Sequence, residues 1–559
     1  MAKKDYTSLS KEQLIELVEK LDSKRKYGLV WEEDRTQEQV VIECREKLPI
    51  LKEVKGKEIT SNINTPTNIL IEGDNFHALS VLNYTHKNSI KIIYIDPPYN
   101  TGKENEFMYN DRYVDSNDGF KHSKWLSFMN KRLELSKNLL TDDGVIFISI
   151  DDNEIAQLKL LCNQIFGEDN FIAQFIRKNK AGAGHDSGQI AVEYDYMLCF
   201  AKNKSNVKFQ KEVLDVENDS KYKLEDEFVS HRGKYYLRDL DYKGSYSESG
   251  DYPILTPDGT EIYSGGKFGR PNTWRWSKDK VQWGIENGYI VFKKNKDNWK
   301  VYIKQYQFVD NENNIRERTL PYRALITFLN SEGSQELNNI VNQNIFKFPK
   351  SVGLIEFCLN LFEDKNLTIL DFFAGSGTTG HAVLSLNSKD NGNRKFILCT
   401  NNENEICEKV TYTRISKVIN GFKNLKNEKI DGIKSNLKYF KTSYVNYNRN
   451  RDQLKIDLTK NCTEMLCLKE NVFNLFKESE DYKIFQQNNK YLAVFYDFES
   501  PSLEELKDIM NKIEGEKVLY CFTLDTELNR NNFRGWKNIK LEPIPQKILE
   551  VYKRIFNND

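Results

Sequence analysis

Four consecutive residues, Asp96-Pro97-Pro98-Tyr99, join a carboxylate, two prolines and an aromatic ring. Because proline has no backbone N–H, this stretch cannot continue a strand ladder, and we expect the carbonyl oxygens of Asp96 and Pro97 to stay available as acceptors. Acceptors next to the flat face of Tyr99 are what an enzyme needs to hold a planar base with an exocyclic amino group. The same four residues are also compatible with a plain turn or with a ligand of small proline-binding domains.

A second chemical signature lies far downstream, in the segment Asp371–His381, which reads DFFAGSGTTGH. Glycines at 375 and 377 allow the backbone to approach a ligand closely, and the start of a helix favours a bound carboxylate or phosphate. The spacing formally fits the GxGxxG pattern of dinucleotide sites. It also has the length of a phosphate loop, but His381 stands where that loop requires lysine, so the sequence argues against ATP.

Strands that end in polar residues must position both signatures. The run Ile90–Ile95 is β-branched or aromatic nearly throughout, which is typical of a parallel strand covered on both faces. We expect further strands at Asn68–Ile71, Val145–Ile150 and Thr368–Leu370, each followed by a turn and a helix. This alternation predicts an α/β fold with a doubly wound, mostly parallel sheet that binds ligands at the carboxyl ends of its strands.

The first motif, which continues into Asn100-Thr101-Gly102, and the segment Asp371–Gly380 together resemble the catalytic motif and the cofactor loop of amino-group DNA methyltransferases that use S-adenosylmethionine. The catalytic motif comes first, an order that resembles the permuted class with target recognition between the two motifs, and in particular the modification subunit of type III restriction-modification systems. The resemblance implies the methyltransferase fold and methyl transfer to the exocyclic amine (N6) of adenine in double-stranded DNA, since an acid at Asp96 is associated mainly with adenine.

The resemblance also implies roles for single residues. Asp96 and the Pro97 carbonyl would accept the two amine hydrogens, Pro98 would complete the rigid tip, and Tyr99 would stack on a flipped base. An acid at Asp74 is by default a helix cap, but the resemblance favours cofactor contact. The expected cofactor-binding residues are Asp74, Asn75, Asp371, Phe373, Ala374, Gly375, Gly377, Thr378 and Asn401.

Three other functions remain open from the sequence. The first is methylation of the N4 amine of cytosine, and the second is methylation of RNA or of a protein side chain. The third is a non-catalytic DNA-recognition subunit that keeps the fold. Intact Asp96 and Tyr99 argue against this third alternative.

The region between the two motifs is expected to read the DNA sequence, because its cations alternate with aromatic and amide side chains. The expected DNA contacts are Lys267, Arg270, Asn272, Arg275 and Lys278. The alternative is a solvated basic surface over core tryptophans.

We divide the chain into a helical lead-in (1–67), a catalytic half (68–206), a target-recognition insertion (207–345), a cofactor-binding half (346–425) and a small α/β C-terminal domain (426–559).

Composition limits the compartment and the partners. The 559 residues carry 82 Lys and Arg against 82 Asp and Glu, so any DNA affinity must come from a local basic surface. The nine cysteines lack metal-site spacing and are expected to be reduced, with no bound metal. Without a signal peptide or a long apolar span, we expect a cytoplasmic protein that contacts no membrane.

The apolar face of the helix predicted at Ser10–Leu21 and the resemblance favour a homodimer that supports a separate restriction subunit with helicase and nuclease activity.

Overall fold

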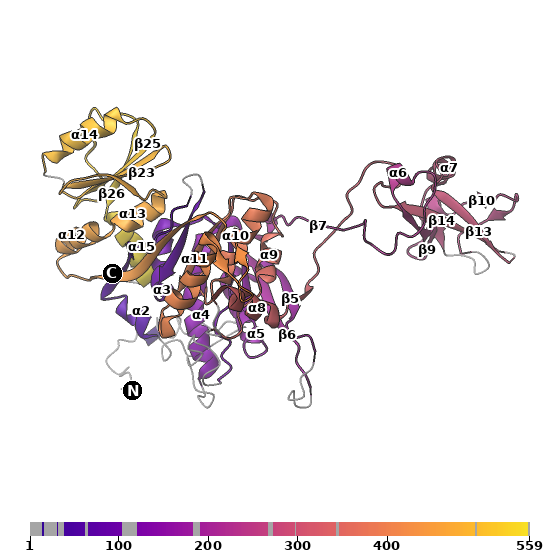
Figure 1. Cartoon of the computed structure of the whole chain (residues 1–559), viewed down its shortest axis with the longest axis horizontal. Coiled ribbons are helices and arrows are strands. Elements are labelled where there is room, and N and C mark those ends of the chain that lie inside the picture. The colour runs from indigo at the N-terminus through magenta and orange to yellow at the C-terminus, as the bar shows by residue number, and fades with distance from the viewer. Residues whose placement is uncertain are drawn as a thin grey trace. The chain divides into compact units, whose positions relative to one another are not determined.

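The computed structural model describes residues 14–15, 31, 38–61, 65–102, 120–182, 190–265, 272–296, 298–341, 346–497 and 500–556. The chain forms two compact units: one comprises Met1–Phe209 and Arg323–Asp559, and the other is Gln210–Tyr322 (Figure 1). The helix predicted at Ser10–Leu21 lies outside the described residues, apart from Leu14 and Ile15.

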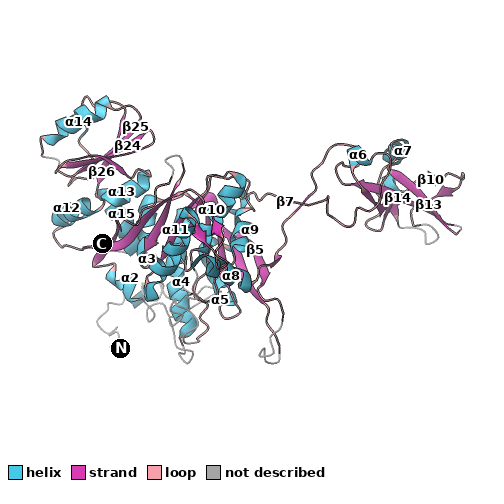
Figure 2. Ribbon diagram, in the orientation of Figure 1, coloured by secondary structure: helices cyan, strands magenta, loops and turns pink. Residues whose placement is uncertain are grey.

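A ten-stranded sheet forms the centre of the first unit (Figure 2). Its six central strands are parallel, and antiparallel pairings occur towards both edges. The prediction of a doubly wound, mostly parallel sheet is therefore confirmed. In spatial order the strands are β1 (Lys47–Glu53), β21 (Asn436–Asn446), β2 (Thr67–Glu72), β18 (Lys395–Thr400), β17 (Thr368–Asp371), β3 (Ile90–Ile95), β4 (Leu140–Ile150), β6 (Tyr194–Ala201), β5 (Phe171–Lys178) and β16 (Leu325–Thr327).

Apolar side chains of β3 are buried on both faces of this sheet. Ile93 and Ile95 belong to one hydrophobic core, shared with helices α3, α4 and α5, while Ile92 and Tyr94 alternate with them and are also buried. The helices of the first unit are α2 (Gln39–Glu43), α3 (Asn75–Thr85), α4 (Lys121–Leu139), α5 (Ile155–Phe166), α8 (Asn330–Val341), α9 (Val352–Leu359), α10 (Thr378–Asp390) and α11 (Thr413–Asn420), the last preceded by a π-helical segment, Ile406–Tyr412.

The direction of the connections reverses between β17 and β3, which are neighbours in the sheet. From β3 the chain passes through α4 to β4 on one side, whereas from β17 it passes through α10 to β18 on the other. Open α/β sheets bind ligands in the crevice at such a reversal, outside the carboxyl ends of the strands. Both sequence signatures follow these two strands.

Residues 426–559 contribute to the central sheet, to a second larger sheet and to one short hairpin. Strand β21 inserts into the central sheet between β1 and β2, and the rest of the segment builds a five-stranded sheet. Side chains of that smaller sheet, including Val494 and Tyr520, share one core with α3 and β1. Its elements are α12 (Arg451–Asn461), α13 (Thr463–Glu470), β22 (Asn474–Glu478), β23 (Tyr482–Gln487), β24 (Lys490–Phe495), α14 (Ser502–Lys512), β25 (Glu516–Phe522), β26 (Ile539–Ile544) and α15 (Gln546–Phe556); a hairpin of β19 (Phe422–Lys423) and β20 (Lys429–Ile430) precedes β21.

The second unit, Gln210–Tyr322, is built from short strands around its own core. Trp274 and Trp276 are buried in that core, as expected for core tryptophans. Its elements are β7 (Glu212–Val213), α6 (Val229–Arg232), β8 (Tyr235–Asp239), β9 (Asp241–Tyr242), β10 (Ile254–Leu255), β11 (Glu261–Ile262), β12 (Thr273–Trp274), α7 (Lys278–Glu286), β13 (Ile290–Asn295), β14 (Asn298–Tyr306) and β15 (Thr319–Leu320).

Three further features bear on the expectations from composition. All nine cysteines are buried free thiols. Within the described ranges, no group of three or more His, Cys, Asp or Glu side chains is arranged to hold a metal ion. Among the described helices, none combines the length and the apolar character needed to cross a membrane.

Because β21 is an internal strand of the central sheet, we expect its core residues to control the stability of the whole first unit. Phe440 is fully buried and pairs with β1 and β2. Phe440→Ala should lower the free energy of unfolding by about 3–5 kcal/mol. Urea denaturation followed by circular dichroism measures this, with the half-buried Ser443→Ala on the same strand as the control. An unchanged main transition for Phe440→Ala would contradict this placement of β21.

Candidate active site

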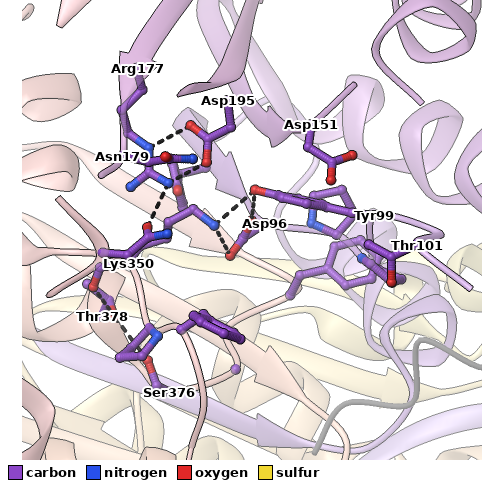
Figure 3. Close-up of a pocket in the computed structure, with 18 of the residues that line it drawn as sticks. Asp96, Tyr99, Thr101, Asp151, Arg177, Asn179, Asp195, Lys350, Ser376 and Thr378 are labelled. Carbon is purple, nitrogen blue, oxygen red and sulfur yellow. Dashed lines mark hydrogen bonds and ion pairs between the residues drawn. The ribbon is translucent and has the colours of Figure 1, made fainter. Parts of the chain in front are cut away.

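A cavity of about 450 Å³ opens at the carboxyl ends of β3 and β17. Asp96 directly follows β3, and Asp371 is the last residue of β17, so the two parallel strands bring both acids to the same edge of the sheet. The cavity has the size of an ordinary small-molecule site. Its lining includes all four residues of the first motif and five of the predicted cofactor residues: Asp371, Phe373, Ala374, Gly375 and Thr378 (Figure 3).

Asp96, Tyr99 and Lys350 form a closed triangle of hydrogen bonds in this cavity. The Tyr99 hydroxyl donates to Asp96 Oδ1 at 2.8 Å, and Lys350 Nζ donates to Asp96 Oδ2 at 2.6 Å and to the Tyr99 hydroxyl at 2.9 Å. Burial, followed by the Asp96 charge, raises the pKa of Tyr99 well above its ordinary value, so the phenol stays protonated. The carboxylate is therefore oriented by two donors before any ligand arrives (Figure 3).

Both ends of the first motif are anchored. The indole Nε1 of Trp125 donates to the Pro98 carbonyl at 2.7 Å. Asn100 takes a positive φ of 59°, and its Nδ2 donates to Glu154 Oε1 at 2.5 Å. Glu154 is fully buried, burial raises its pKa, and His122 contacts the same oxygen at 2.6 Å. The strand, the indole and the buried carboxyl together hold the tip rigid.

Lys350 reaches the motif from a segment before α9 that two helices hold in place. The Thr378 hydroxyl, at the start of α10, donates to the Lys350 carbonyl at 3.2 Å. On α8, a Cβ added to Gly333 would lie 2.1 Å from the Pro349 carbonyl oxygen, so only glycine allows this approach. Lys350 is 9 % exposed and its ammonium lies 5.1 Å from the centre of the Tyr99 ring.

The glycine loop after β17 surrounds the buried carboxyl of Asp371. The Phe373 backbone N–H donates to Asp371 Oδ1 at 3.0 Å, and the Thr379 hydroxyl donates to Oδ2 at 2.5 Å. Burial raises the pKa of Asp371 to about 7. Gly375 and Gly377 have φ values of +47° and +76°, conformations that favour glycine.

A buried cation supports the same loop from behind. Arg414 on α11 is fully buried, and its Nη1 donates to the Thr378 hydroxyl at 2.8 Å and to Ser376 Oγ at 3.2 Å. Burial lowers the pKa of Arg414 to about 10. The loop is thus fixed by side-chain bonds as well as by its glycines.

The residues around the glycine loop fit S-adenosylmethionine by two observations. At the end of β18, beside the loop, the buried oxygens Thr400 Oγ1 and Asn401 Oδ1 have no hydrogen-bond partner among the described residues, as expected for atoms that meet a polar ligand. On the cavity side, a Cβ at Gly375 would lie 3.2 Å from the Phe346 ring, so a larger residue there would crowd this wall of the cavity.

Four of the predicted cofactor residues do not line the cavity. Asp74 caps α3 by accepting from the Phe76 N–H at 2.7 Å, and Asn75 Nδ2 donates to the Phe372 carbonyl at 2.9 Å. Asn401 lies at the end of β18, and a Cβ at Gly377 would lie 3.1 Å from Thr411. Asp74 thus caps a helix and Asn75 links the turn after β2 to the loop after β17, and their contact with a cofactor stays a prediction.

The cavity has a further wall that the sequence did not indicate. Arg177 on β5 donates from Nε to Asp195 Oδ1 on β6 at 2.7 Å and from Nη2 to Asn330 Oδ1 at 3.0 Å. Arg177, Asn179, Asp195 and Asn330 all line the cavity. The order of the strands and helices brings these four residues close to Asp96.

The predicted DNA contacts belong to the second unit, and Lys267 and Arg270 lie outside the described residues. Asn272 is half-buried, and Lys278 is exposed at the start of α7. Arg275 is exposed: its Nε donates to the Asp239 carbonyl at 3.1 Å, and its guanidinium lies 5.3 Å from the Tyr242 ring centre, beside a hollow of about 290 Å³. Their contact with DNA stays a prediction.

Comparison with known proteins gives consistent matches. The chain is 33% identical over 394 residues to the type III restriction-modification enzyme StyLTI Mod subunit of Salmonella typhimurium (66% of this chain, 58% of that protein). It is 30% identical over 447 residues to the EcoPI Mod subunit of Escherichia phage P1 (70% and 66%), and 32% identical over 399 residues to the type II methyltransferase M.KpnI of Klebsiella pneumoniae (67% and 93%).

The chain therefore spans 58% and 66% of the two Mod subunits that it matches. The family described as DNA methylase matches residues 90–412, which is more than half of the sequence and includes both strand-end signatures. On this evidence the chain belongs to the DNA methylase family.

Proposed function

We propose that this chain is a site-specific DNA methyltransferase that transfers a methyl group from S-adenosylmethionine to the N6 amine of adenine. The observation that carries the proposal is the hydrogen-bonded Asp96, Tyr99 and Lys350 triangle, which faces the glycine loop across one cavity. Relatives named as Mod subunits and as a type II methyltransferase support it.

The residues at the tip of β3 would prepare the target amine. The lone pair of an aromatic amine is delocalised into the ring, so the nitrogen is a poor nucleophile. Acceptance of one hydrogen by Asp96 and of the other by the Pro97 carbonyl would make the nitrogen more tetrahedral and expose the lone pair. Tyr99 would stack on the base, which must leave the duplex to enter the cavity, and stacking offsets the cost by roughly 1–3 kcal/mol.

Asp371 and the loop Phe373–Thr378 would hold the cofactor. S-adenosylmethionine, when bound, supplies an electrophilic methyl group on a sulfonium. Lys350 would hold Asp96 in a fixed orientation, so that Asp96 acts as an acceptor throughout and need not remove a proton before the new bond forms. The rigid anchoring at Trp125 and Glu154 would keep this geometry during turnover.

We extend the proposal to partners and compartment on the names of the relatives. Double-stranded DNA would be the substrate, read by the unit Gln210–Tyr322. The chain would act in the cytoplasm as a homodimer and serve as the modification subunit for a separate restriction subunit. Expression in a host free of DNA methylation, with modification-sensitive sequencing and nucleoside analysis, tests the central claim. N6-methyladenine at one sequence motif is the expected result, and N4-methylcytosine or unmodified DNA would overturn it.

The first prediction concerns the acceptor. Asp96→Ala should abolish methyl transfer, and Asp96→Asn should reduce kcat by about 10²–10³-fold because one neutral oxygen remains. Radiolabel transfer to DNA measures the rates. The surface variant Asp142→Asn, whose side chain is 79 % exposed, is the matched control and should retain full activity. Normal turnover of both Asp96 variants would refute the role of this carboxylate.

The second prediction concerns Lys350. Lys350→Met keeps the length of the side chain but loses both charge-assisted bonds, so kcat should fall roughly 10–100-fold while KM for DNA changes little. Steady-state kinetics separates the two constants, and the melting temperature checks the fold. Lys365→Met, on an exposed lysine, serves as the control. Unchanged kcat would show that the triangle is structural only.

The third prediction uses the pKa of about 7 for Asp371. At pH 6 the carboxyl is mostly protonated and neutral, whereas at pH 8 it is ionised and attracts the sulfonium and ammonium charges of the cofactor. Affinity should therefore be about tenfold weaker at pH 6 than at pH 8. The cofactor amine becomes more protonated at pH 6, which would act in the opposite direction.

Isothermal titration calorimetry at the two pH values makes the measurement. Asp371→Asn has no ionisable group at this position, so its weaker affinity should lose this pH dependence. An equal affinity of the native chain at pH 6 and pH 8, or the same dependence in Asp371→Asn, would contradict the assignment of the titrating group.

A further inference from the structure

The motif Asp96–Tyr99 divides the cavity into two halves. On one side lie β17 and its glycine loop, with Asp371 and Gly375. On the other side lie the ends of β4, β6 and β5, which carry Asp151, Asp195 and Asn179. If the glycine loop holds the cofactor, a base that presents its amine to Asp96 must occupy the second half. The following inference rests on the proposed function in that respect.

Most polar groups in this second half already have partners. Arg177 and Asp195 satisfy each other through two hydrogen bonds, and Asn330 Oδ1 accepts from Arg177. Asp151 accepts from the Asn153 N–H at 2.9 Å. These side chains form a fixed wall and have little capacity left for a ligand.

Asn179 is the exception in this wall. Its backbone is held on both sides, because its N–H donates to the Glu193 carbonyl and its carbonyl accepts from the Asn330 N–H, each at 2.9 Å. Asn179 is only 9 % exposed, and its side-chain Oδ1 has no hydrogen-bond partner among the described residues. Figure 3 places it beside the Arg177–Asp195 pair, on the Lys350 side of the cavity. A buried amide oxygen without a partner is unfavourable unless a ligand satisfies it.

We propose that Asn179 is a specificity-determining residue that reads the amino edge of the target base. A primary amide offers one acceptor and one donor side by side. Adenine presents the complement, an amine N–H next to a ring nitrogen, whereas guanine and thymine present an oxo group where the amide oxygen would need a donor. Oδ1 accepts the amine hydrogen together with the Pro97 carbonyl, and Nδ2 donates to the adjacent ring nitrogen.

The test uses the duplex that contains the sequence motif found by modification-sensitive sequencing. Asn179→Leu and Asn179→Asp each remove the donor while keeping the size of the side chain. Each should lower kcat/KM by about 10- to 100-fold, the range for a lost bidentate contact with a base. Asn163→Leu is the matched control, because Asn163 Oδ1 is also buried without a described partner but lies on α5 outside the cavity. Cofactor affinity by calorimetry should be unchanged in all three variants.

Base analogues make the test independent of the folding of any variant. Of two duplexes that carry 7-deazaadenine or 1-deazaadenine at the target, the native chain should methylate one about 10- to 100-fold more slowly, because that analogue lacks the ring nitrogen that Nδ2 contacts. In Asn179→Leu the same analogue should cost nothing further. Full rates on both analogues, or an equal loss in Asn179→Leu, would overturn the inference.

These outcomes separate the inference from the proposed function. Absence of any methyl transfer to DNA by the native chain, or transfer to cytosine, defeats the proposed function itself. Normal transfer to adenine with full activity of both Asn179 variants defeats only the role of Asn179.

Discussion

The parallel pairing of β3 with β17 is the contact on which the site depends. Ile92 and Ile93 pair with Ile369 and Leu370, and this register alone brings the acid after one strand to the acid that ends the other. The connections leave these strands in opposite directions, the arrangement in which open α/β sheets bind ligands in a crevice at the strand ends. β3 and β17 are far apart in sequence but are neighbours in the sheet. The chain between them includes the whole unit Gln210–Tyr322.

The cavity handles its negative charge in two distinct ways. Asp96 and Asp195 each pair with a buried cation, Lys350 and Arg177, which fixes the orientation of the two side chains. Asp371 accepts hydrogen bonds only from neutral donors, so burial raises its pKa. The carboxyls near β3 and β6 therefore have cationic partners, whereas the carboxyl at the end of β17 has none among the described residues.

The sequence predicted the local features well, because each was encoded within a few adjacent residues. The strand expected at Ile90–Ile95 is β3 with the same bounds, and the glycine turn expected after Thr368–Leu370 follows β17. Lys350, Arg177 and Asn179 were missed, since their importance arises from strand order and from helices that pack far apart in sequence. The position of β21 in the central sheet was equally hidden, because a strand pattern does not state which strand it will pair with.

The placement of β21 also has a consequence for synthesis on the ribosome. Until residues 436–446 have emerged, β2 lacks one neighbour and β1 has no strand to pair with in the central sheet. Nascent chains of this protein consequently carry unpaired hydrogen-bonding edges and exposed apolar strands for most of translation, the condition under which aggregation competes with folding. Completion of the central sheet must wait for a late segment of the chain, so we expect protection of these edges by chaperones to matter during its synthesis.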